Sequence, residues 1–283
     1  MTKLAYRIVN VFTRAGALTG NALCVFEDGS GLDEGTMQAL ARQFNLSETT
    51  FVLRSERATA GVRIFTPAYE MPFAGHPTLG TAHVVRSLQG AGDAVVLEMK
   101  AGLIPVSAKG DRWTLAANAP RWREVGESRR ELAAILGLEA GDIVERPLWV
   151  NTGKEQLVVP VASEEAVRRA RPLADAFSRL RSEDGHSMAY VFAREGDDRV
   201  WARFFFPSGS AILEDPATGS ACANLGGWFC ALHPGLDVQL TVAQGDLVHR
   251  PSTLFLTVSG GRVHVAGDVT EIARGVLDIP HPA

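Results

Sequence analysis

The segment RIFTPAYEMPFAG, residues 63–75, returns in the second half of the chain as RFFFPSGSAILEDPATG, residues 203–219. The first part of the match, R-x-F-x-P, is displaced by 203 − 63 = 140 residues, and the second part, E-x-P-x-x-G, by 214 − 70 = 144 residues. The second copy has therefore gained 144 − 140 = 4 residues in the turn between the two parts. A repeat of this length is too long for a solenoid and indicates two copies of one domain.

Around these anchors, the two halves carry the same mixture of short strands and helices. Strand-like runs such as YRIVNVF (6–12) and GVRIF (61–65) accompany helical patterns over 35–44 and 78–88 in the first half. The second half has strand-like runs such as RVWARFFF and the helical run SACANLGGWFCAL. No regular strand–helix–strand period runs through the chain, which favours an α+β fold over a doubly wound one. We place the two domains at residues 1–118 and 119–283.

The copies differ at a few polar positions, and these differences indicate function rather than fold. A residue that the fold requires should occur in both copies, whereas each of these polar residues occurs in one copy only. The matched positions are Glu48 with Met188, His76 with Ser220, and Met71 with Asp215.

Each copy also begins a helix with a glycine, Gly75 in G-H-P-T and Gly219 in T-G-S-A. The first N–H groups of a helix have no partner within the helix, and the helix dipole is positive there, so both starts suit a carboxylate or a similar anion. If the two helix starts converge about a pseudo-twofold axis, the polar residues that differ between the copies line the cleft between the domains. Clefts between domains are common sites for small molecules.

Composition argues against several classes of protein. The net charge of −4 and the lack of any basic run argue against a nucleic-acid partner. No apolar run reaches the ~18 residues that span a bilayer, and the N-terminus lacks a signal-peptide pattern, so we expect a cytoplasmic protein without a membrane segment. Cys24, Cys222 and Cys230 have no metal-ligand spacing and are expected to be reduced thiols. Nucleotide-binding glycine motifs are absent as well, and we expect no metal and no cofactor.

Without a cofactor, proton transfer is the chemistry that a carboxylate, an imidazole and two anion-binding helix starts can perform together. Each of these residues also has a plainer interpretation. Glu48 in N-L-S-E-T-T can be a solvated loop carboxylate, His76 can pack beside its turn, and Asp215 can bond the backbone of its own turn. A glycine-headed helix start in both copies favours the functional interpretation.

Five segments together resemble the phenazine biosynthesis PhzF-like isomerase family, occur in that family's order and span nearly the whole chain. The resemblance implies a fold similar to that of diaminopimelate epimerase, with two like halves. Each half is a barrel-like antiparallel or mixed sheet around a central helix, and the final segment crosses back onto the first domain. The segments are T-G-N-A (19–22), L-S-E-T-T-F (46–51), F-T-P-A-Y-E-M-P-F-A-G-H-P-T-L-G (65–80), E-D-P-A-T-G-S-A (214–221) and Q-G-D-L-V-H-R-P-S (244–252).

The resemblance also implies an activity and the residues that perform it. In the namesake enzyme, a glutamate moves a proton during isomerisation of trans-2,3-dihydro-3-hydroxyanthranilate, without metal or cofactor. By motif that glutamate is Glu48, and the other catalytic residues are His76 and Asp215. The substrate-binding positions are Ser47, Gly75, Gly219 and Ser220.

One departure from related enzymes narrows the mechanism. Epimerases of this fold carry a cysteine directly before each helix glycine, where this chain has Ala74 and Thr218. Cys222 lies further into its helix and is expected to face the core. Epimerisation by two thiols is therefore not expected.

The expected function is a cofactor-independent isomerase that acts on a small carboxylate, with Glu48 as general acid and base. The alternative is a protein of the same fold that binds a small carboxylate or a protein partner without turnover. The resemblance further implies a homodimer.

Overall fold

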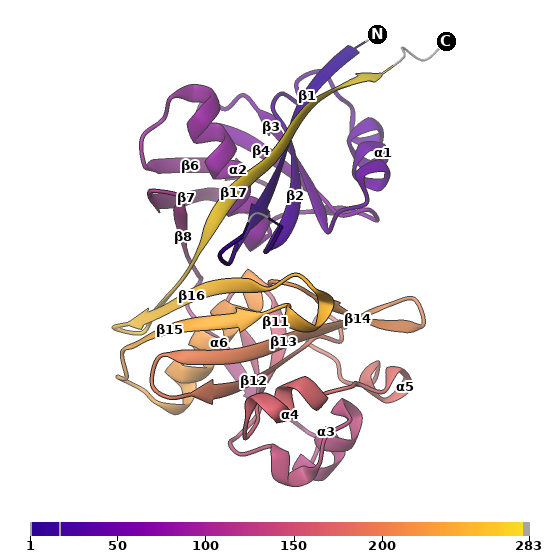
Figure 1. Cartoon of the computed structure of the whole chain (residues 1–283), viewed down its shortest axis with the longest axis vertical. Helices are drawn as coiled ribbons and strands as arrows, with labels where there is room; N and C mark the ends of the chain where they lie inside the picture. The colour runs from indigo at the N-terminus through magenta and orange to yellow at the C-terminus, as the bar shows by residue number, and fades with distance from the viewer. Residues whose placement is uncertain (1, 17, 280–283) are drawn as a thin grey trace. The chain divides into compact units, whose positions relative to one another are not determined.

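The computed structural model describes residues 2–16 and 18–279 of the chain, which divides into two units (Figure 1). The first unit comprises Met1–Leu115 and Ala266–Ala283, and the second comprises Ala116–Val265. The division lies close to residue 118, the boundary expected from the sequence. Each unit mixes helices with antiparallel and parallel strands, as an α+β fold requires.

The first unit is a closed barrel of strands around a central helix. Neighbouring strands pair in the order β1, β2, β3, β4, β6, β7, β8 and β17, and β17 pairs again with β1. The helix α2 contacts most of these strands, and its residues 76–82 are all buried. The bounds are β1 Thr2–Val11, β2 Asn21–Phe26, α1 Glu34–Phe44, β3 Glu48–Leu53, β4 Ala60–Phe65, β5 Glu70–Met71, α2 Gly75–Gln89, β6 Ala94–Met99, β7 Gly102–Lys109, β8 Arg112–Ala116 and β17 Arg262–Ile279.

The second unit arranges its strands in the same way around α6. Its strands pair in the order β9, β10, β11, β12, β13, β15 and β16, and β14 forms a hairpin with β13. Three short α-helices and one 3-10 helix that the sequence analysis does not anticipate lie between β9 and β12. The bounds are β9 Arg121–Glu124, α3 Arg129–Leu136, η1 Ala140–Asp142, β10 Leu148–Asn151, β11 Glu155–Pro160, α4 Glu164–Arg169, α5 Ala174–Phe177, β12 Ala189–Glu195, β13 Arg199–Ser208, β14 Ala211–Asp215, α6 Gly219–Leu232, β15 Val238–Gln244, η2 Asp246–Val248 and β16 Ser252–Ser259.

The pairing of the strands confirms the internal repeat. Both units contain two parallel pairs, β2–β3 with β4–β6 in the first and β11–β12 with β13–β15 in the second, and the corresponding hairpins are antiparallel. The register also agrees, because Thr49 faces Phe65 in the first unit and Ala189 faces Phe205 in the second. Both residues of the second pair are 140 positions after those of the first.

The repeated R-x-F-x-P and E-x-P-x-x-G motifs form the same contact in both units. Arg63 Nε lies 2.7 Å from Glu70 Oε1, and Arg203 Nε lies 3.0 Å from Glu214 Oε2. Each guanidinium also lies over the ring of the phenylalanine two residues later, at 5.1 Å from the centroid in the first unit and 4.6 Å in the second. Such a stacked, ion-paired arginine ties the two strands of the hairpin together. The motif is therefore repeated because both copies of the fold need it.

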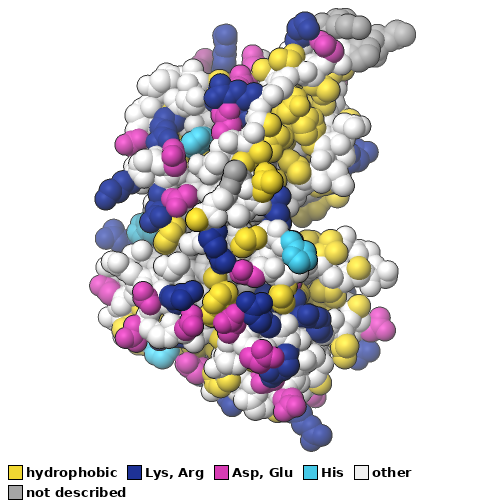
Figure 2. Space-filling model, viewed as in Figure 1, with side chains coloured by type: hydrophobic (Ala, Val, Ile, Leu, Met, Phe, Trp, Pro, Cys, Tyr) yellow, Lys and Arg dark blue, Asp and Glu magenta, His cyan; other side chains and the backbone are white. Residues whose placement is uncertain are grey.

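Charged side chains of both signs are intermixed on the face shown in Figure 2. This distribution agrees with the small net charge of −4. Among the described residues, no helix is long and apolar enough to cross a membrane.

Candidate active site

Glu48 and His76 lie together in the first unit. Glu48 is the first residue of β3, and His76 is the second residue of α2. The His76 Nδ1 atom lies 3.3 Å from Glu48 Oε2, and the two side chains are 6% and 16% exposed respectively. The parallel pairing of β2 with β3 places Leu23 opposite Glu48. The carboxyl is thus held beside an apolar strand and remains partly accessible.

The His76 imidazole is neutral at neutral pH. Burial lowers its pKa to about 4, although the nearby backbone of Ala22 acts in the opposite direction. A neutral imidazole has one N–H donor and one acceptor nitrogen. Nδ1 faces Glu48 Oε2, and Nε2 is buried without a hydrogen-bond partner among residues 2–16 and 18–279. A polar group of a ligand can satisfy Nε2.

The start of α2 is open to an anion. Its N-cap residue, Ala74, provides no side-chain hydrogen bond, and the first turn contains no acidic residue. Gly75 is only half-buried, so its backbone can be approached closely. Nearby, Ser47 Oγ donates to Asn21 Oδ1 at 3.4 Å, which connects the residue before Glu48 to the T-G-N-A segment.

In the second unit, Asp215 is held by two neighbouring residues, Thr218 and Gln244. Thr218 Oγ1 donates to Asp215 Oδ2 at 2.6 Å. The buried Gln244 side chain donates to the Asp215 carbonyl oxygen at 2.8 Å and to Thr218 Oγ1 at 3.0 Å, while its own oxygen accepts from Thr218 N at 3.3 Å. Thr218, which stands where related epimerases have a cysteine, therefore orients the neighbouring carboxylate.

Ser220 lies in the first turn of α6, after Gly219. As in α2, no side chain caps this helix and no acidic residue lies in its first turn. Ser220 Oγ accepts a hydrogen bond from Gln156 Nε2 at 2.9 Å. Gln156 lies on β11 and is 2% exposed.

The structure thus places the predicted site residues in two clusters, one in each unit, which we call half-sites. Within the first unit it brings together the catalytic and binding residues predicted near α2, and within the second unit those predicted near α6. Three buried amides were missed from the sequence. A glutamine in the apolar strand EQLVVP and an asparagine in the apolar helix SACANLGGWF were the available signals. The first half-site is Ser47, Glu48, Gly75 and His76, the second is Asp215, Gly219 and Ser220, and the missed amides are Gln156, Asn224 and Gln244.

Two of the three cysteines are buried in the interior of the units. Cys24 and Cys222 are fully buried, and burial raises the pKa of both thiols. Cys222 therefore faces the core of its unit, as expected from the sequence. Among the described residues, no group of three or more His, Cys, Asp or Glu side chains is arranged to hold a metal ion.

Comparison with known sequences connects this arrangement to named proteins. A family model described as "Phenazine biosynthesis-like protein" matches residues 9–275. A trans-2,3-dihydro-3-hydroxyanthranilate isomerase from Pseudomonas chlororaphis is 32% identical over 286 residues, covering 96% of this chain and 98% of that protein. A protein named as an uncharacterized isomerase from Pasteurella multocida is 34% identical over 284 residues, covering 99% of this chain and 96% of that protein.

Comparison with solved structures gives the same result for the fold. A PhzF-family protein from Bacillus anthracis has a TM-score of 0.87 and 26% identity, covering 99% of this chain and 100% of that chain. A hydroxyproline epimerase from Agrobacterium vitis has a TM-score of 0.64 at 14% identity, covering 99% and 94%. The second likeness, at 14% identity, concerns the fold alone.

Proposed function

The chain belongs to the phenazine biosynthesis-like (PhzC-PhzF) protein family and is an isomerase, and from this premise we propose how it works. The proposed reaction is a cofactor-independent proton transfer on a small carboxylate, with Glu48 as general acid and base. The observation that carries the proposal is the 3.3 Å approach of a buried, neutral imidazole to the Glu48 carboxyl. The relatives named as hydroxyanthranilate isomerases support the reaction type.

In the proposed mechanism, a Glu48 carboxylate oxygen removes a proton from a substrate carbon activated by an adjacent unsaturated group. The electron pair of the broken C–H bond moves into the conjugated system, and the protonated Glu48 returns the proton to a different carbon. The substrate is neither oxidised nor reduced, so the reaction needs no redox partner. His76 Nδ1–H steadies the carboxylate oxygen in the step where it is charged.

We further propose that the two half-sites act on one substrate, as the family resemblance implies. The open helix starts at Gly75 and Gly219 are suited to the anionic part of the substrate. Asp215 and Ser220 supply an acceptor and a hydroxyl beside the second of these starts. On the same resemblance we propose that the chain is a homodimer, and a sedimentation experiment that finds a monomer at micromolar concentration contradicts this.

The decisive variant is Glu48→Gln, which keeps the shape of the side chain and removes the carboxyl group that can accept and return a proton. With trans-2,3-dihydro-3-hydroxyanthranilate in deuterated water, we expect turnover and deuterium incorporation to fall by ~10³–10⁴-fold, because one residue performs both proton transfers. Binding of the small carboxylate anthranilate should be retained. The matched control is Glu56→Gln, since Glu56 is an exposed glutamate of the same unit.

Deuterium incorporation by Glu48→Gln near the wild-type rate excludes Glu48 as the base. If the wild-type chain binds anthranilate but incorporates no deuterium into the substrate or its analogues, the alternative of a binding protein without turnover is correct.

A further inference from the structure

The hydroxyl of Ser220 stands at the end of a buried chain of amide hydrogen bonds. Gln156 Nε2 donates to Ser220 Oγ at 2.9 Å, and Gln156 Oε1 accepts from Asn224 Nδ2 at 2.8 Å. Asn224 lies one turn further along α6 and has no exposed surface. A buried polar chain of this kind must be fully hydrogen-bonded to be stable.

Backbone groups fix the direction of every bond in this chain. Asn224 Oδ1 accepts from the backbone N–H of Thr152 at 2.9 Å and from its hydroxyl at 2.7 Å, while Asn224 Nδ2 donates to the carbonyl oxygen of Lys154 at 2.8 Å. A backbone N–H can only donate and a carbonyl can only accept, so the Asn224 amide has one possible orientation. Gln156 must then turn its oxygen toward Asn224 and its nitrogen toward Ser220.

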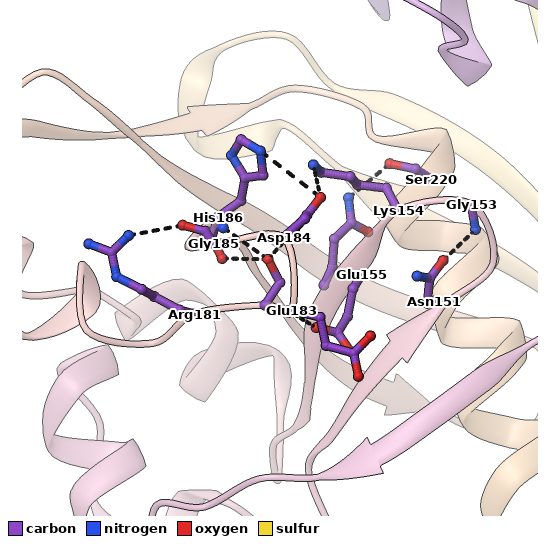
Figure 3. Close-up of polar contacts among 12 residues, drawn as sticks. Asn151, Gly153, Lys154, Glu155, Arg181, Glu183, Asp184, Gly185, His186 and Ser220 are labelled. Atoms are coloured by element: carbon purple, nitrogen blue, oxygen red, sulfur yellow. Dashed lines mark hydrogen bonds and ion pairs between the residues drawn. The ribbon is translucent and has the colours of Figure 1, made fainter. Parts of the chain in front are cut away.

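The hairpin that supplies those backbone groups is anchored from its other side as well. Figure 3 shows the loop of residues 181–186 beside it, where Lys154 forms an ion pair with Asp184 and the backbone N–H of Glu183 donates to Glu155 Oε2 at 2.6 Å. Ser220 lies in the same view. The backbone groups of Thr152 and Lys154 that orient the Asn224 amide are therefore held in place.

The corresponding position of the first unit is apolar, which shows that the fold does not require the polar chain. Gly80 is the counterpart of Asn224, because 80 + 144 = 224. A Cβ atom added to Gly80 would lie 2.7 Å from Leu23 and 2.9 Å from Val11. Leu23 matches Gln156, because Leu23 faces Val9 as Gln156 faces Val150. Val11 follows Val9 by two residues, as Thr152 follows Val150. Valine, leucine and glycine in one unit thus take the places of threonine, glutamine and asparagine in the other. The same arrangement of strands and central helix forms with the apolar residues in the first unit and with the polar residues in the second.

We propose that Gln156 and Asn224 are positioning residues that make the Ser220 hydroxyl a hydrogen-bond donor to the substrate. Because Ser220 Oγ accepts from Gln156, one of its two lone pairs is occupied and its proton points away from the Gln156 nitrogen. Either oxygen of a carboxylate can accept this proton, whereas the NH2 end of a neutral amide cannot, so the arrangement favours a carboxylate. The inference rests on the proposed function, since Ser220 is placed in the substrate site there.

The test compares two probes of similar shape, anthranilate and its neutral amide anthranilamide, by calorimetric titration of the full-length protein. Gln156→Glu replaces the donor nitrogen by an acceptor, which draws the Ser220 proton toward the introduced carboxylate. We expect anthranilate to bind the variant about tenfold or more weakly, the equivalent of one hydrogen bond to a charged group. The affinity for anthranilamide should decrease much less. The ratio of the two affinities, which favours anthranilate in the wild type, should therefore become smaller or reverse.

Two further variants separate this effect from added charge and from damage to the fold. Gln156→Met is a neutral change and should weaken the binding of anthranilate about threefold to tenfold. In a protein that already carries Ser220→Ala, the same change should not alter the anthranilate affinity further. A purely structural role predicts the same loss in both backgrounds. The matched control is Gln239→Glu, because Gln239 is an exposed glutamine of the same unit and the change adds the same charge.

Anthranilate affinity of Gln156→Glu within about twofold of the wild type overturns the proposal. So does a wild-type chain that binds neither probe, or binds both equally, at millimolar concentration. An active Glu48→Gln variant refutes the proposed base but leaves these binding results standing, so the two proposals fail separately.

Discussion

The two arginine–glutamate pairs of the repeat occupy equivalent places and differ in what surrounds them. In the first unit, Arg63 is 22% exposed, and Glu70 has Lys100 as a second cationic partner. In the second unit, Arg203 and Glu214 are 9% and 7% exposed, and the arginine also donates to three carbonyl oxygens at the end of α4. The contact belongs to the fold, but its contribution to stability depends on the neighbours that each copy has acquired.

The largest effect is expected for Arg203→Met, which should lower the free energy of unfolding by about 3–5 kcal/mol, since it leaves Glu214 as an uncompensated buried charge. Arg63→Met should cost only about 1–2 kcal/mol, because Lys100 still compensates Glu70. Urea denaturation of both variants measures the difference. Equal losses in the two units contradict this account. The double variant Arg203→Met with Glu214→Leu should recover much of the loss.

A smaller effect is the part of the free energy of unfolding that His76 makes dependent on pH, about 3 kcal/mol at most. The second unit has a serine at the matching position and lacks this dependence. The folded chain protonates His76 only near pH 4, whereas an unfolded histidine does so near 6.5. Between these values the unfolded state binds more protons, so the free energy of unfolding decreases as the pH falls from about 6.5 to 4. His76→Ser introduces the residue that the second unit has at this position and should remove this part of the pH dependence.

The measurement for His76 is a series of denaturation curves across that pH range for the wild type and the variant. The slope of stability against pH decides the outcome, because the substitution also changes stability at every pH by altering a buried site. Parallel slopes for the two proteins exclude His76 as the titrating group.

The smallest effect concerns the apolar contact that replaces the amide chain in the first unit. Gly80→Ala places a Cβ atom 2.7 Å from Leu23 Cδ2 and 2.9 Å from Val11 Cγ2, closer than such atoms approach. Overpacking should lower the free energy of unfolding by about 1–3 kcal/mol, partly offset by the better helix propensity of alanine. Gly92→Ala is the control, since nothing lies within 4 Å of its added atom. A Gly80 variant as stable as the control shows that the site has room to relax.

Local patterns in the sequence were sufficient to predict the repeat and the two helix starts. The R-x-F-x-P and E-x-P-x-x-G motifs recur because each unit needs the same arginine–glutamate contact in its hairpin. The two copies therefore still match at these positions in the sequence. The family motifs assigned Glu48 and His76 to one site, and the two side chains approach to 3.3 Å although they lie on different elements. The plainer interpretation of Glu48 as a solvated loop carboxylate was wrong, because β3 begins at Glu48 and the side chain is 16% exposed.

The amide network could not be predicted from the sequence. Thr152 and Asn224 are 72 residues apart, and Gln156 and Ser220 are 64 apart, so no local period relates them. A glutamine within an apolar strand can face solvent at an edge or be buried, and only the partners brought by the fold decide between these. The short helices α4 and α5 were missed because segments of six and four residues are too short to show a helical period.

The long strand β17 has a consequence for how the molecule is made. It begins in the second unit and ends in the first, where Val269 pairs with Val11 and Ile279 with Thr2. A chain growing from its N-terminus on the ribosome therefore carries β1 with an unpaired edge while the whole second unit, up to Val265, is being synthesised. Such an edge can pair with other chains, and only the final residues remove it. The first unit to be translated is the last that can be completed.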